Sequence, residues 1–501
     1  MKKNKLGIRF LALIAAILIT LSVLAGCKTE KPPVNTGEPK SSGEQTTNAS
    51  TTNDPFDYDE NGYIKDTIPE VDYEDKKVNL LCWIDDAGIS TMPDQTSDIR
   101  VDAELYMRRS RIEERLGVVL NVKNEPGGAA KMNDFLKLME NARSGGIPYD
   151  SVCAYSTAGP IIATRGWAKN LYELTYPQTE MPWWSEAINE WELYGKLFFI
   201  ANNSSRQSLH NMIVMFCNSE MFTSRGMTDP VEEVLNENWT IETMLTDIQN
   251  FESTSEGGPY AMVVDDSTRL DLFYYGCGFR NTRKTDDKVE LAYTSQTDID
   301  RITTLIDRLI PTFNSDRVTI APTTVQTMIQ GKTALMVAPL FNIQRLDNYD
   351  YCVIPAPMLD SNQENYITVQ TAGFDVWVVP NDSSDPELSG MIIEAVASSD
   401  YRDIAPIYFD SYMKLGYSQS VSHSGIFDII RGTLTYDFGR INAAELSYRC
   451  EGAFRKCFVH QLADGTWAPY AQNGYKAYIE SRIDKMNDAL ATLLDKYKEL
   501  N

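Results

Sequence analysis

The chain has 501 residues, of which 46 are Lys or Arg and 70 are Asp or Glu, and its formal net charge is −24. Such an acidic chain is a poor partner for nucleic acid, because phosphate binding depends on Lys and Arg. The body from about residue 71 to residue 501 exceeds what one hydrophobic core usually supports, so we expect two lobes.

The N-terminus resembles a secretory signal followed by a lipid-attachment site. A basic start, Lys2–Arg9, precedes an apolar run, Phe10–Ala25. That run has 16 residues, fewer than the roughly 20 needed to span a membrane. The segment Leu24-Ala25-Gly26-Cys27 resembles the bacterial lipobox. We expect residues 1–26 to be removed as a signal peptide and Cys27 to be lipidated; an ordinary signal with an incidental cysteine is the alternative.

Residues 27–70 are predicted to be the lipidated cysteine and a disordered tether. Between Lys28 and about Asp54 the chain is mostly Thr, Asn, Ser, Gly, Glu and Pro, a composition that buries too little apolar surface to fold. A flexible segment of about 27 residues reaches roughly 26 to 31 Å, which would hold a globular body clear of a membrane. Removal of the signal takes away four basic and no acidic residues, so the net charge changes from −24 to −28.

Strands and helices are predicted to alternate after the tether. Val78–Ile84 is an apolar run typical of a buried strand, and a helix around Leu105–Leu116 follows and ends at Gly117. Val118–Val122 is the next strand, Met132–Ala142 marks a second amphipathic helix, and Tyr149–Tyr155 is a third strand. This alternation predicts a parallel sheet with helices on its faces.

Polar residues follow two of these strands. Asp85 and Asp86 come after the first strand, and Tyr155 and Ser156 end the third. Ligands of open sheets bind beyond the carboxyl ends of strands. Carboxylates can accept hydrogen bonds from a hydroxylated ligand, and a Tyr ring can pack on its apolar face. The alternative is that Asp85 and Asp86 only shape a turn.

The first predicted helix is rich in arginine. Its arginines are interleaved with Glu104, Glu113 and Glu114, which is typical of a solvated helix face rather than a basic binding patch. These arginines are Arg108, Arg109, Arg111 and Arg115.

Seven cysteines remain after Cys27, an odd number that cannot form a complete set of disulfides. Most lie in apolar contexts, so we expect buried free thiols. If residues 443–460 are helical, Cys450 and Cys457 lie about 10.5 Å apart along the axis, too far for a disulfide.

The later part of the chain continues the alternation. Lys196–Ala201 and Met212–Phe216 are predicted strands, and Thr240 is a plausible N-cap for the helix that follows it. The C-terminus carries one long apolar stripe, which predicts a helix docked on its own lobe, with a self-pairing coiled coil as the alternative. The stripe consists of Ile479, Ile483, Met486, Leu490, Leu493 and Tyr497.

Several short segments carry a family resemblance through their shared order. They are residues 81–83, 111–117, 149–152, 195–198, 216–220, 328–335, 351–355 and 379–381. In this order they resemble the extracellular solute-binding proteins of family 1, which deliver mostly sugars to ABC transporters. No single segment is diagnostic.

The resemblance implies an α/β fold of the two-lobed periplasmic-binding-protein type (type II), with a ligand cleft between lobes joined by several crossings. Lobe 1 would comprise residues 71–213 plus about 354–400. Lobe 2 would comprise residues 214–353 plus about 401–501. Hinge motion would then exchange open and closed forms.

The resemblance also implies cleft positions. Lobe 1 would contribute the four residues at the strand ends named above. Where many sugar binders have Trp after Gly-Pro, this chain has Ala338-Pro339-Leu340, so a main stacking platform is missing or is supplied by Phe341. The remaining implied positions are Arg206, His210 and Asn211 near the first crossing, Asp266, Leu340 and Phe341 in lobe 2, and Tyr436, Asp437, Phe438 and Arg440 in the aromatic segment.

Other aromatic and titratable residues allow two interpretations. Tyr274 and Tyr275 are candidates for ligand stacking, whereas packing is favoured for the pair Trp183-Trp184. A surface or packing role is also favoured for His210. Asp437-Phe438-Gly439 matches a kinase motif, but its accompanying motifs are missing. There is no phosphate-binding loop, and the chain has only three scattered histidines, so we predict no cofactor and no metal site.

Together these features predict a lipid-anchored solute-binding protein on the extracytoplasmic face of a bacterial membrane, with a Gram-positive-like envelope. It would bind a small polar solute, foremost a carbohydrate, as a monomer and without catalysis. Its protein partners would be the permease subunits of an ABC importer, whose ATPase is another polypeptide. The alternatives are a surface glycoside hydrolase, which needs only two suitably spaced carboxylates, and a sensory or adhesion lipoprotein.

Overall fold

The computed structural model describes residues 56–85, 88–97, 99–251, 259–320, 324–346, 351–417, 421–446, 450–461, 467–469 and 472–500. The chain divides into two compact units, Met1–Tyr63 and Ile64–Asn501. The predicted signal peptide, Cys27, most of the tether and Asp86 lie outside the described residues. The fold and the site described below belong to the unit Ile64–Asn501.

The first sheet has four strands in the order β12-β3-β1-β2. β1 pairs in parallel with β2 and β3, and β12 joins the other edge of β3 antiparallel. This confirms the predicted parallel β-α-β-α-β unit and adds a strand from much later in the chain. The strands are β1 (Lys76–Ile84), β2 (Val118–Pro126), β3 (Ser151–Tyr155) and β12 (Asp375–Val378).

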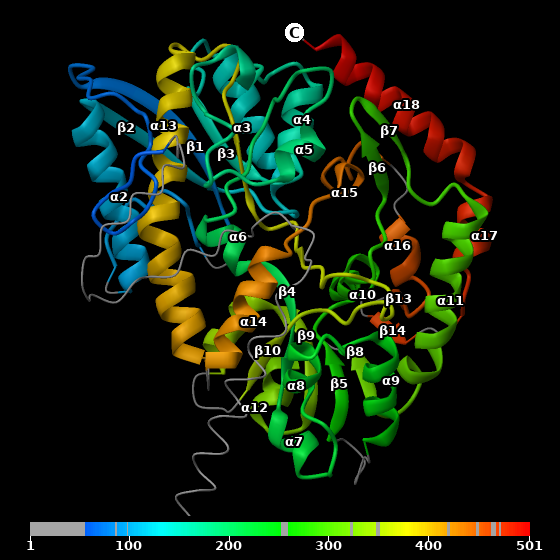
Figure 1. The fold of residues 1–501 in the computed structure, drawn as a ribbon. Coiled ribbons are helices and arrows are strands. Elements are labelled where there is room, and N and C mark those ends of the chain that lie inside the picture. The colour runs from blue at the N-terminus through cyan, green and yellow to red at the C-terminus, as the bar shows by residue number, and fades with distance from the viewer. Residues whose placement is uncertain are drawn as a thin grey trace, which may run out of the picture. The chain divides into compact units, whose positions relative to one another are not determined.

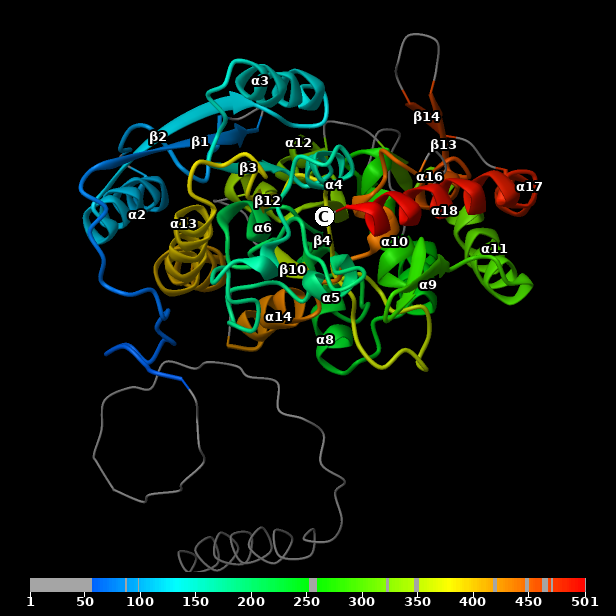
Figure 2. The same cartoon turned by 90° about the horizontal axis from the view of Figure 1, so that it is seen from above.

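Helices cover both faces of this sheet. Figure 2 shows α3 (Met132–Ser144) on one side, and α2 (Arg100–Leu116) and α13 (Pro386–Ser399) on the other. α2 ends at Gly117, whose φ of 60° is left-handed and whose backbone N–H bonds to the carbonyl of Glu113, as predicted for a C-terminal glycine.

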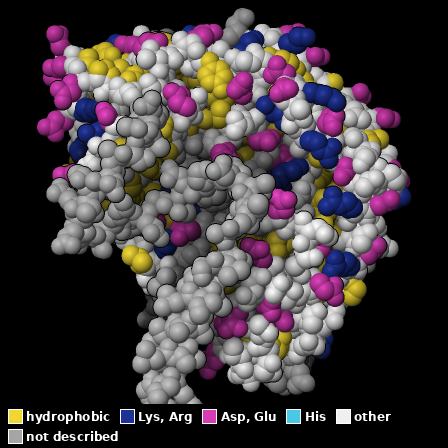
Figure 3. All heavy atoms as spheres, viewed as in Figure 1, with side chains coloured by type: hydrophobic (Ala, Val, Ile, Leu, Met, Phe, Trp, Pro, Cys, Tyr) yellow, Lys and Arg dark blue, Asp and Glu magenta, His cyan; other side chains and the backbone are white. Residues whose placement is uncertain are grey.

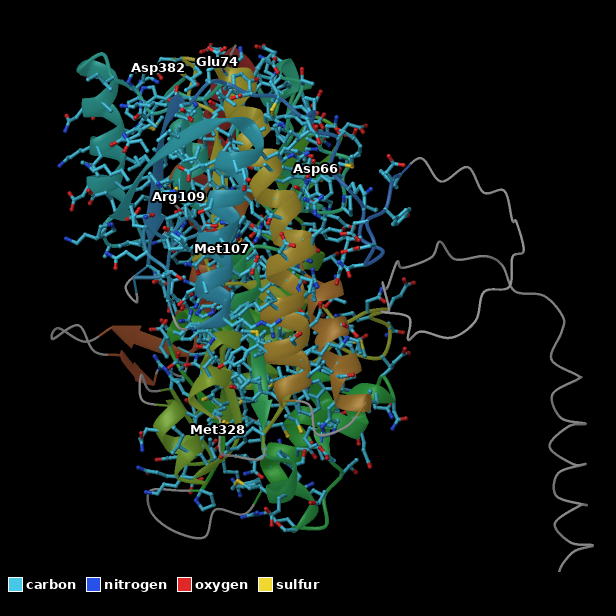
Figure 4. All side chains as sticks on the ribbon, turned by 90° about the vertical axis from the view of Figure 1, so that its left-hand side faces the viewer. Asp66, Glu74, Met107, Arg109, Met328 and Asp382 are labelled. Atoms are coloured by element: carbon cyan, nitrogen blue, oxygen red, sulfur yellow. The ribbon has the colours of Figure 1, made fainter. Side chains whose placement is uncertain are left out.

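The arginine-rich face of α2 is only partly solvated. The Arg108 side chain is 0% exposed, and its guanidinium bonds to Asp400 and to the backbone carbonyl of Thr91. α2 packs against α13 and its continuation η4 (Asp400–Ile404), as Figure 4 shows beside the labelled Met107 and Arg109. The prediction of a solvated face is therefore wrong for Arg108, because local charge spacing cannot reveal a distant helix that covers one side.

The second sheet has six strands, five in the order β10-β4-β9-β5-β8, with β11 paired to β4. β5 runs parallel to β8 and β9, whereas β4 runs antiparallel to β9, β10 and β11. Figure 1 shows it below the first sheet. The strands are β4 (Met212–Cys217), β5 (Tyr260–Val264), β8 (Val318–Ile320), β9 (Thr333–Pro339), β10 (Cys352–Ile354) and β11 (Val369–Gln370).

Short helices and two hairpins surround the second sheet and fill the connections. Thr240 caps α9 by accepting a hydrogen bond from the backbone N–H of Thr243 at 3.3 Å, which confirms the predicted helix start. The hairpins are β6 (Thr282–Thr285) with β7 (Lys288–Leu291) and β13 (Val459–Gln461) with β14 (Trp467–Pro469). The remaining helices are α4 (Ala158–Thr164), η1 (Leu171–Glu173), α5 (Ala187–Trp191), α6 (Arg206–His210), α7 (Ser219–Thr223), α8 (Pro230–Leu235), α9 (Ile241–Asn250), η2 (Ser267–Leu270), α10 (Asp271–Gly276), α11 (Gln296–Phe313), α12 (Thr324–Ile329), η3 (Leu340–Arg345), η5 (Pro406–Leu415), α14 (Val421–Gly432), α15 (Phe438–Ile441), α16 (Cys450–Arg455), α17 (Tyr475–Glu480) and α18 (Ile483–Glu499).

Three local predictions need correction, and a fourth is confirmed. The C-terminal apolar stripe is divided between α17 and α18 at Ser481 and Arg482, so it is not one helix. Lys196–Ala201 forms isolated bridges at Lys196 and Ile200 rather than a strand. Within 443–460, the only helix among the described residues is the short α16, and β13 begins at Val459. All seven cysteines after Cys27 are free and buried, as predicted.

The chain passes between the two sheets at three places. It enters the second sheet at β4, directly after α6, and returns between Gln370 in β11 and Asp375 in β12. The third passage follows α13 through η4 and η5 to α14, which packs on β10. None of the helices within the described residues combines the length and the apolar character that crossing a membrane requires.

Candidate functional site

A cleft of about 560 Å³ lies at the carboxyl ends of β1 and β3. Its other side is formed by segments around η2, α10, α15 and α16, and the passages between the sheets close its base near Asn211 and 371–373. This is the position at which open parallel sheets bind ligands. Asp85, Tyr155, Asn211 and Arg440 line this cleft among the positions proposed from the sequence.

An aromatic pair forms the wall on the first sheet. The rings of Trp83 and Tyr155 meet edge to face, with centroids 5.3 Å apart and planes at 83°. Trp83 Nε1 donates a 2.7 Å hydrogen bond to Asp375 Oδ1 in β12. Gly127 permits the close packing here, because a Cβ at that position would lie 2.7 Å from Trp83 Cβ. Burial raises the pKa of Asp375 to about 6, against the opposing effect of the Trp83 hydrogen bond.

Asp85 shapes a turn and also lines the cleft. Its Oδ1 accepts from the backbone N–H of Ile89 at 2.8 Å, and its carbonyl accepts from Gly88 at 3.0 Å. Its Oδ2 lies 3.5 Å from Gln207 Nε2 at the start of the first passage. The two interpretations of this residue are therefore compatible.

Asn211 ties two of the passages together at the base of the cleft. Its Nδ2 donates to the Gly373 carbonyl at 2.6 Å, and its Oδ1 accepts from Thr371 Oγ1 at 2.8 Å. Its backbone carbonyl also accepts from the Thr371 N–H at 2.8 Å. This side chain therefore connects the segments that would bend if the lobes moved.

The wall opposite the aromatic pair is rich in arginine. Asp271, whose side chain is 1% exposed, accepts from Nε and Nη2 of Arg455 at 2.6 and 2.5 Å. Arg440 Nη1 lies 3.0 Å from the same carboxylate, and its Nη2 donates to the Gln370 carbonyl at 2.6 Å. Paired bonds between a guanidinium and a carboxylate are strong and fix orientation.

The three arginines of this wall differ in how fully their charge is compensated. For Arg440 and Arg455 burial is the largest single effect and disfavours the charge, but Asp271 and Glu451, joined by Tyr275 for Arg440, together outweigh it and raise the pKa of both. For Arg269 burial dominates and lowers the pKa, because Asp265 and the other nearby carboxylates offset it only partly.

A second, much smaller cavity of about 20 Å³ adjoins the cleft, and Ser156, Tyr436 and Asp437 line it. Ser156 Oγ donates to the Ala372 carbonyl at 2.7 Å. Asp437 caps α15, accepting from the Arg440 N–H at 3.0 Å, and it also accepts from the Asn281 N–H at 2.5 Å. This space holds no more than a water-sized group, so these residues support the cleft from behind.

His210 belongs to a packed cluster rather than to the cleft wall. Its ring stacks on Phe341 with centroids 4.8 Å apart, and its Nδ1 forms a hydrogen bond with the hydroxyl of Tyr408. Burial, followed by the charge of Arg206, lowers the pKa of His210 to about 3. Arg206 itself pairs with Asp102 on α2. The packing interpretation of His210 is confirmed.

Tyr274 and Tyr275 are fully buried on α10. The Tyr274 hydroxyl donates to the Arg280 carbonyl at 3.0 Å, and the Tyr275 hydroxyl accepts from Asn281 Nδ2 at 2.8 Å. Arg440 lies over the Tyr275 ring, 4.7 Å from its centroid. Tyr275 therefore reaches the cleft only through the arginine that it supports.

The remaining proposed positions have local structural contacts. Asp266 caps η2 through the Thr268 N–H at 2.7 Å, and Leu340 and Phe438 are fully buried. Trp183 and Trp184 are buried too, and both donate to Glu394, which confirms their packing role. Among the described residues that line the cleft, eleven sequence candidates do not occur: Ser156, Arg206, His210, Asp266, Tyr274, Tyr275, Leu340, Phe341, Tyr436, Asp437 and Phe438.

Several cleft residues were not proposed from the sequence. Trp83 lies two positions before Asp85, a spacing that places both on one face of an extended segment, so this signal was available. Arg269, Asp271 and Arg455 lie on short helices without a pattern of their own, and only the fold brings them together. Within the part of the chain that the structure describes, no group of three or more His, Cys, Asp or Glu side chains could hold a metal ion.

Comparisons with known proteins give matches to solved structures alone. No family model and no curated protein matches the chain. An extracellular solute-binding protein from Staphylococcus aureus, in complex with maltose, aligns with TM-score 0.55 and 12% identity over 83% of this chain and 98% of its own. The sugar-binding protein MalE from Xanthomonas citri aligns with TM-score 0.55 and 11% identity over 85% and 100%.

A third match is UgpB from Mycobacterium tuberculosis, in complex with glycerophosphocholine, with TM-score 0.54 and 14% identity over 82% of this chain and 98% of its own. Sequence identities this low support a shared fold and no further conclusion about this chain. The chain has the two-lobed α/β fold of periplasmic binding proteins, which confirms the predicted fold class.

Proposed function

We propose that this protein is an extracytoplasmic solute-binding protein that captures a small carbohydrate for an ABC importer. The observation that carries the proposal is the cleft of about 560 Å³, with an aromatic wall facing a polar wall, in a two-lobed fold. Sites of about 300 to 1,000 Å³ suit small ligands, and a few convergent polar groups fix ligand orientation. Two of the similar solved structures named above hold a ligand, maltose in one and glycerophosphocholine in the other.

The mechanism is capture by closure. The aromatic pair on β1 and β3 presents an apolar face for the CH groups of a sugar ring. The arginines on the other wall, with Asn211 at the base, supply hydrogen bonds. Closure would bring the two walls together on the solute, and the closed form would dock on the permease.

The family membership, the anchor and the partners are parts of this proposal. The order of sequence segments supports family 1, and the lipobox-like segment supports lipidation of Cys27 and attachment of a monomer to the outer face of the membrane. The ATPase of the importer would be a separate polypeptide. The protein would bind its solute without chemical conversion.

Binding and turnover can be separated in one experiment with the chain from residue 28 onward. A glycan array identifies a ligand, and X-ray scattering then measures the radius of gyration with and without it. We expect compaction at saturation and no change in the sugar after prolonged incubation. Hydrolysis products would favour the surface glycoside hydrolase instead, and unchanged dimensions at saturation would count against capture by closure.

A further inference from the structure

The cleft reverses the charge of the chain around it. The chain carries a net charge of −24, and Figure 3 shows acidic side chains spread over one face, with basic ones mainly over β7 and α11. Among the described residues that line the cleft, the charged ones are three arginines and two aspartates, whose formal charges sum to +1. They are Arg269, Arg440, Arg455, Asp85 and Asp271.

The positive wall is only partly neutralised from within. Asp271 is shared by two guanidiniums, and it makes hydrogen bonds to only one of them, Arg455. Arg440 Nη1 lies 3.0 Å from Asp271 but finds no hydrogen-bond acceptor among the described residues. The buried carboxylate of Glu451 also favours the charge of both arginines. The wall is therefore compensated unevenly, and Arg440 keeps an N–H without an acceptor among the described residues.

Of the three arginines, Arg269 has the least compensation of its positive charge. Its Nη1 donates to Thr268 Oγ1 at 3.1 Å, and its Nε has no hydrogen-bond partner among the described residues. Its ion-pair contact with Asp265 is 3.8 Å long. Burial lowers the pKa of this guanidinium, so an anion beside it would relieve an unfavourable charge. Its side chain is 19% exposed, so a solute in the cleft can reach it.

The facing wall has a different chemistry. Trp83 and Tyr155 form the edge-to-face pair, and Met132 and Ala129 extend this apolar surface. A ligand that satisfies both walls needs an apolar ring face and, on its opposite side, one negative charge. A neutral sugar would leave Arg269 without a close counter-charge in a site that closure dehydrates.

We propose that the solute is an acidic sugar. Its ring packs on Trp83 and Tyr155, and its single anionic group, a uronate carboxylate or a sulfate ester, is bound by Arg269, Arg440 and Arg455. A planar guanidinium recognises either group with two parallel hydrogen bonds. This inference rests on the proposed function and specifies the class of solute that the same cleft takes.

The test uses sugars that differ only in the acidic group, measured by calorimetry on the chain from residue 28 onward. The probes are galacturonic acid with galactose, cellobiouronic acid with cellobiose, and a sulfated member of each series. We expect an acidic member to bind at least about tenfold more tightly than its neutral counterpart, because hydrogen bonds to charged groups contribute about 1.5 to 3 kcal/mol. Comparison of the uronates with the sulfates identifies the anionic group. Raising the salt concentration should weaken the binding of the acidic sugar and leave the binding of the neutral sugar unchanged.

Arg269→Gln is the decisive variant, because Arg269 makes no hydrogen bond to Asp271 and its loss leaves the Arg455 pair intact. We expect about a tenfold loss of affinity for the acidic sugar and none for the neutral sugar. Arg283→Gln removes the same charge from an exposed site on the β6–β7 hairpin and serves as the control. Arg269→Lys keeps the charge, so a partial recovery of affinity shows that folding is not the cause.

The outcomes separate this inference from the proposed function. If the neutral sugars bind as tightly as the acidic ones, or if R269Q lowers both affinities equally, the acidic-sugar inference is wrong while the binding function stands. If no sugar on a glycan array binds, the proposed function is wrong and the inference fails with it.

Discussion

Two arginine–aspartate clusters in this molecule have opposite characters. In the first, Arg108 and Asp400 are 0% and 1% exposed, and Asn202 Nδ2 donates to the second carboxylate oxygen at 2.8 Å. In the second, Asp271 is equally buried, but Arg440 and Arg455 retain exposed fractions of 16% and 17% toward the cleft. The first cluster joins α2 to η4 and has no access to a ligand. The second is built around a carboxylate yet leaves cationic groups facing open space.

A structural ion pair differs from a binding wall in two features, its access to a ligand and its charge balance. A buried pair contributes little net stability but is costly to break, because the remaining partner is left without compensation. A cluster with partly exposed cations loses less stability on substitution and can bind a ligand. The expected consequences of substitution therefore differ in kind between the two clusters.

The largest effect is expected for Arg108→Met in the structural cluster. Loss of the guanidinium leaves Asp400 buried without its cation, and we expect the free energy of unfolding to fall by about 3 to 5 kcal/mol at pH 8. Burial already raises the pKa of Asp400 to about 7, although Arg108 lowers it. The variant should lose less stability at pH 5.5, where Asp400 can take up a proton. Denaturant unfolding at the two pH values measures both effects.

Arg111→Ala is the matched control on the same helix. Its side chain is 45% exposed, and it pairs with Glu104 and Asp403 at the surface. Surface pairs of this kind contribute about 0 to 1 kcal/mol, so its removal should change stability little. Equal losses for the two variants would show that burial does not distinguish the Arg108 pair.

The same contrast explains how far the sequence could predict this molecule. Elements with a local signal were predictable: the parallel unit of β1, β2 and β3, the left-handed Gly117 and the Thr240 cap all depend on residues within one turn or strand. The position of Asp85 and Tyr155 at strand ends followed from a general rule of open sheets.

The rest depends on contacts between distant segments. The burial of Arg108 requires η4, whose Asp400 lies 292 residues later in the chain. The arginine wall requires η2, α15 and α16 to meet, and none of these short helices has a periodic pattern that predicts its orientation. The division of the C-terminal stripe at Arg482 also has no apolar signal, because the stripe continues across it.

The aromatic wall provides the next largest effect. Tyr155→Ala removes the ring that meets Trp83 edge to face, and we expect solute affinity to fall roughly thirtyfold, corresponding to about 2 kcal/mol for a well-packed aromatic anchor. Titration calorimetry with the ligand from the array measures this loss. Tyr172→Ala removes a ring that is 39% exposed and does not line the cleft, so it should leave affinity unchanged. A similar affinity for wild type and Tyr155→Ala would remove this wall from the binding site.

The smallest effect is expected at His210, which shows a third way of burying a polar group: the side chain stays neutral. Burial and the neighbouring Arg206 lower the pKa of His210 to about 3, whereas an unfolded histidine titrates near 6.5. The stabilising effect of the neutral ring is therefore complete above about pH 6.5 and is lost as the pH falls toward 3. At pH 5.5 this linkage should destabilise the wild type by about 1.4 kcal/mol relative to its stability above pH 6.5.

His210→Gln removes the titrating group while keeping a side chain that can bond to the Tyr408 hydroxyl. We expect the variant to be less stable than the wild type at pH 7.5, because it loses the stacking on Phe341, and to lose less stability between pH 7.5 and 5.5. The difference between the two slopes, measured by denaturant unfolding, isolates His210 from the carboxylates that titrate in both proteins. Parallel curves would mean that His210 is protonated to the same extent in the folded and unfolded states, and that the cluster with Phe341 and Tyr408 does not exclude its charge.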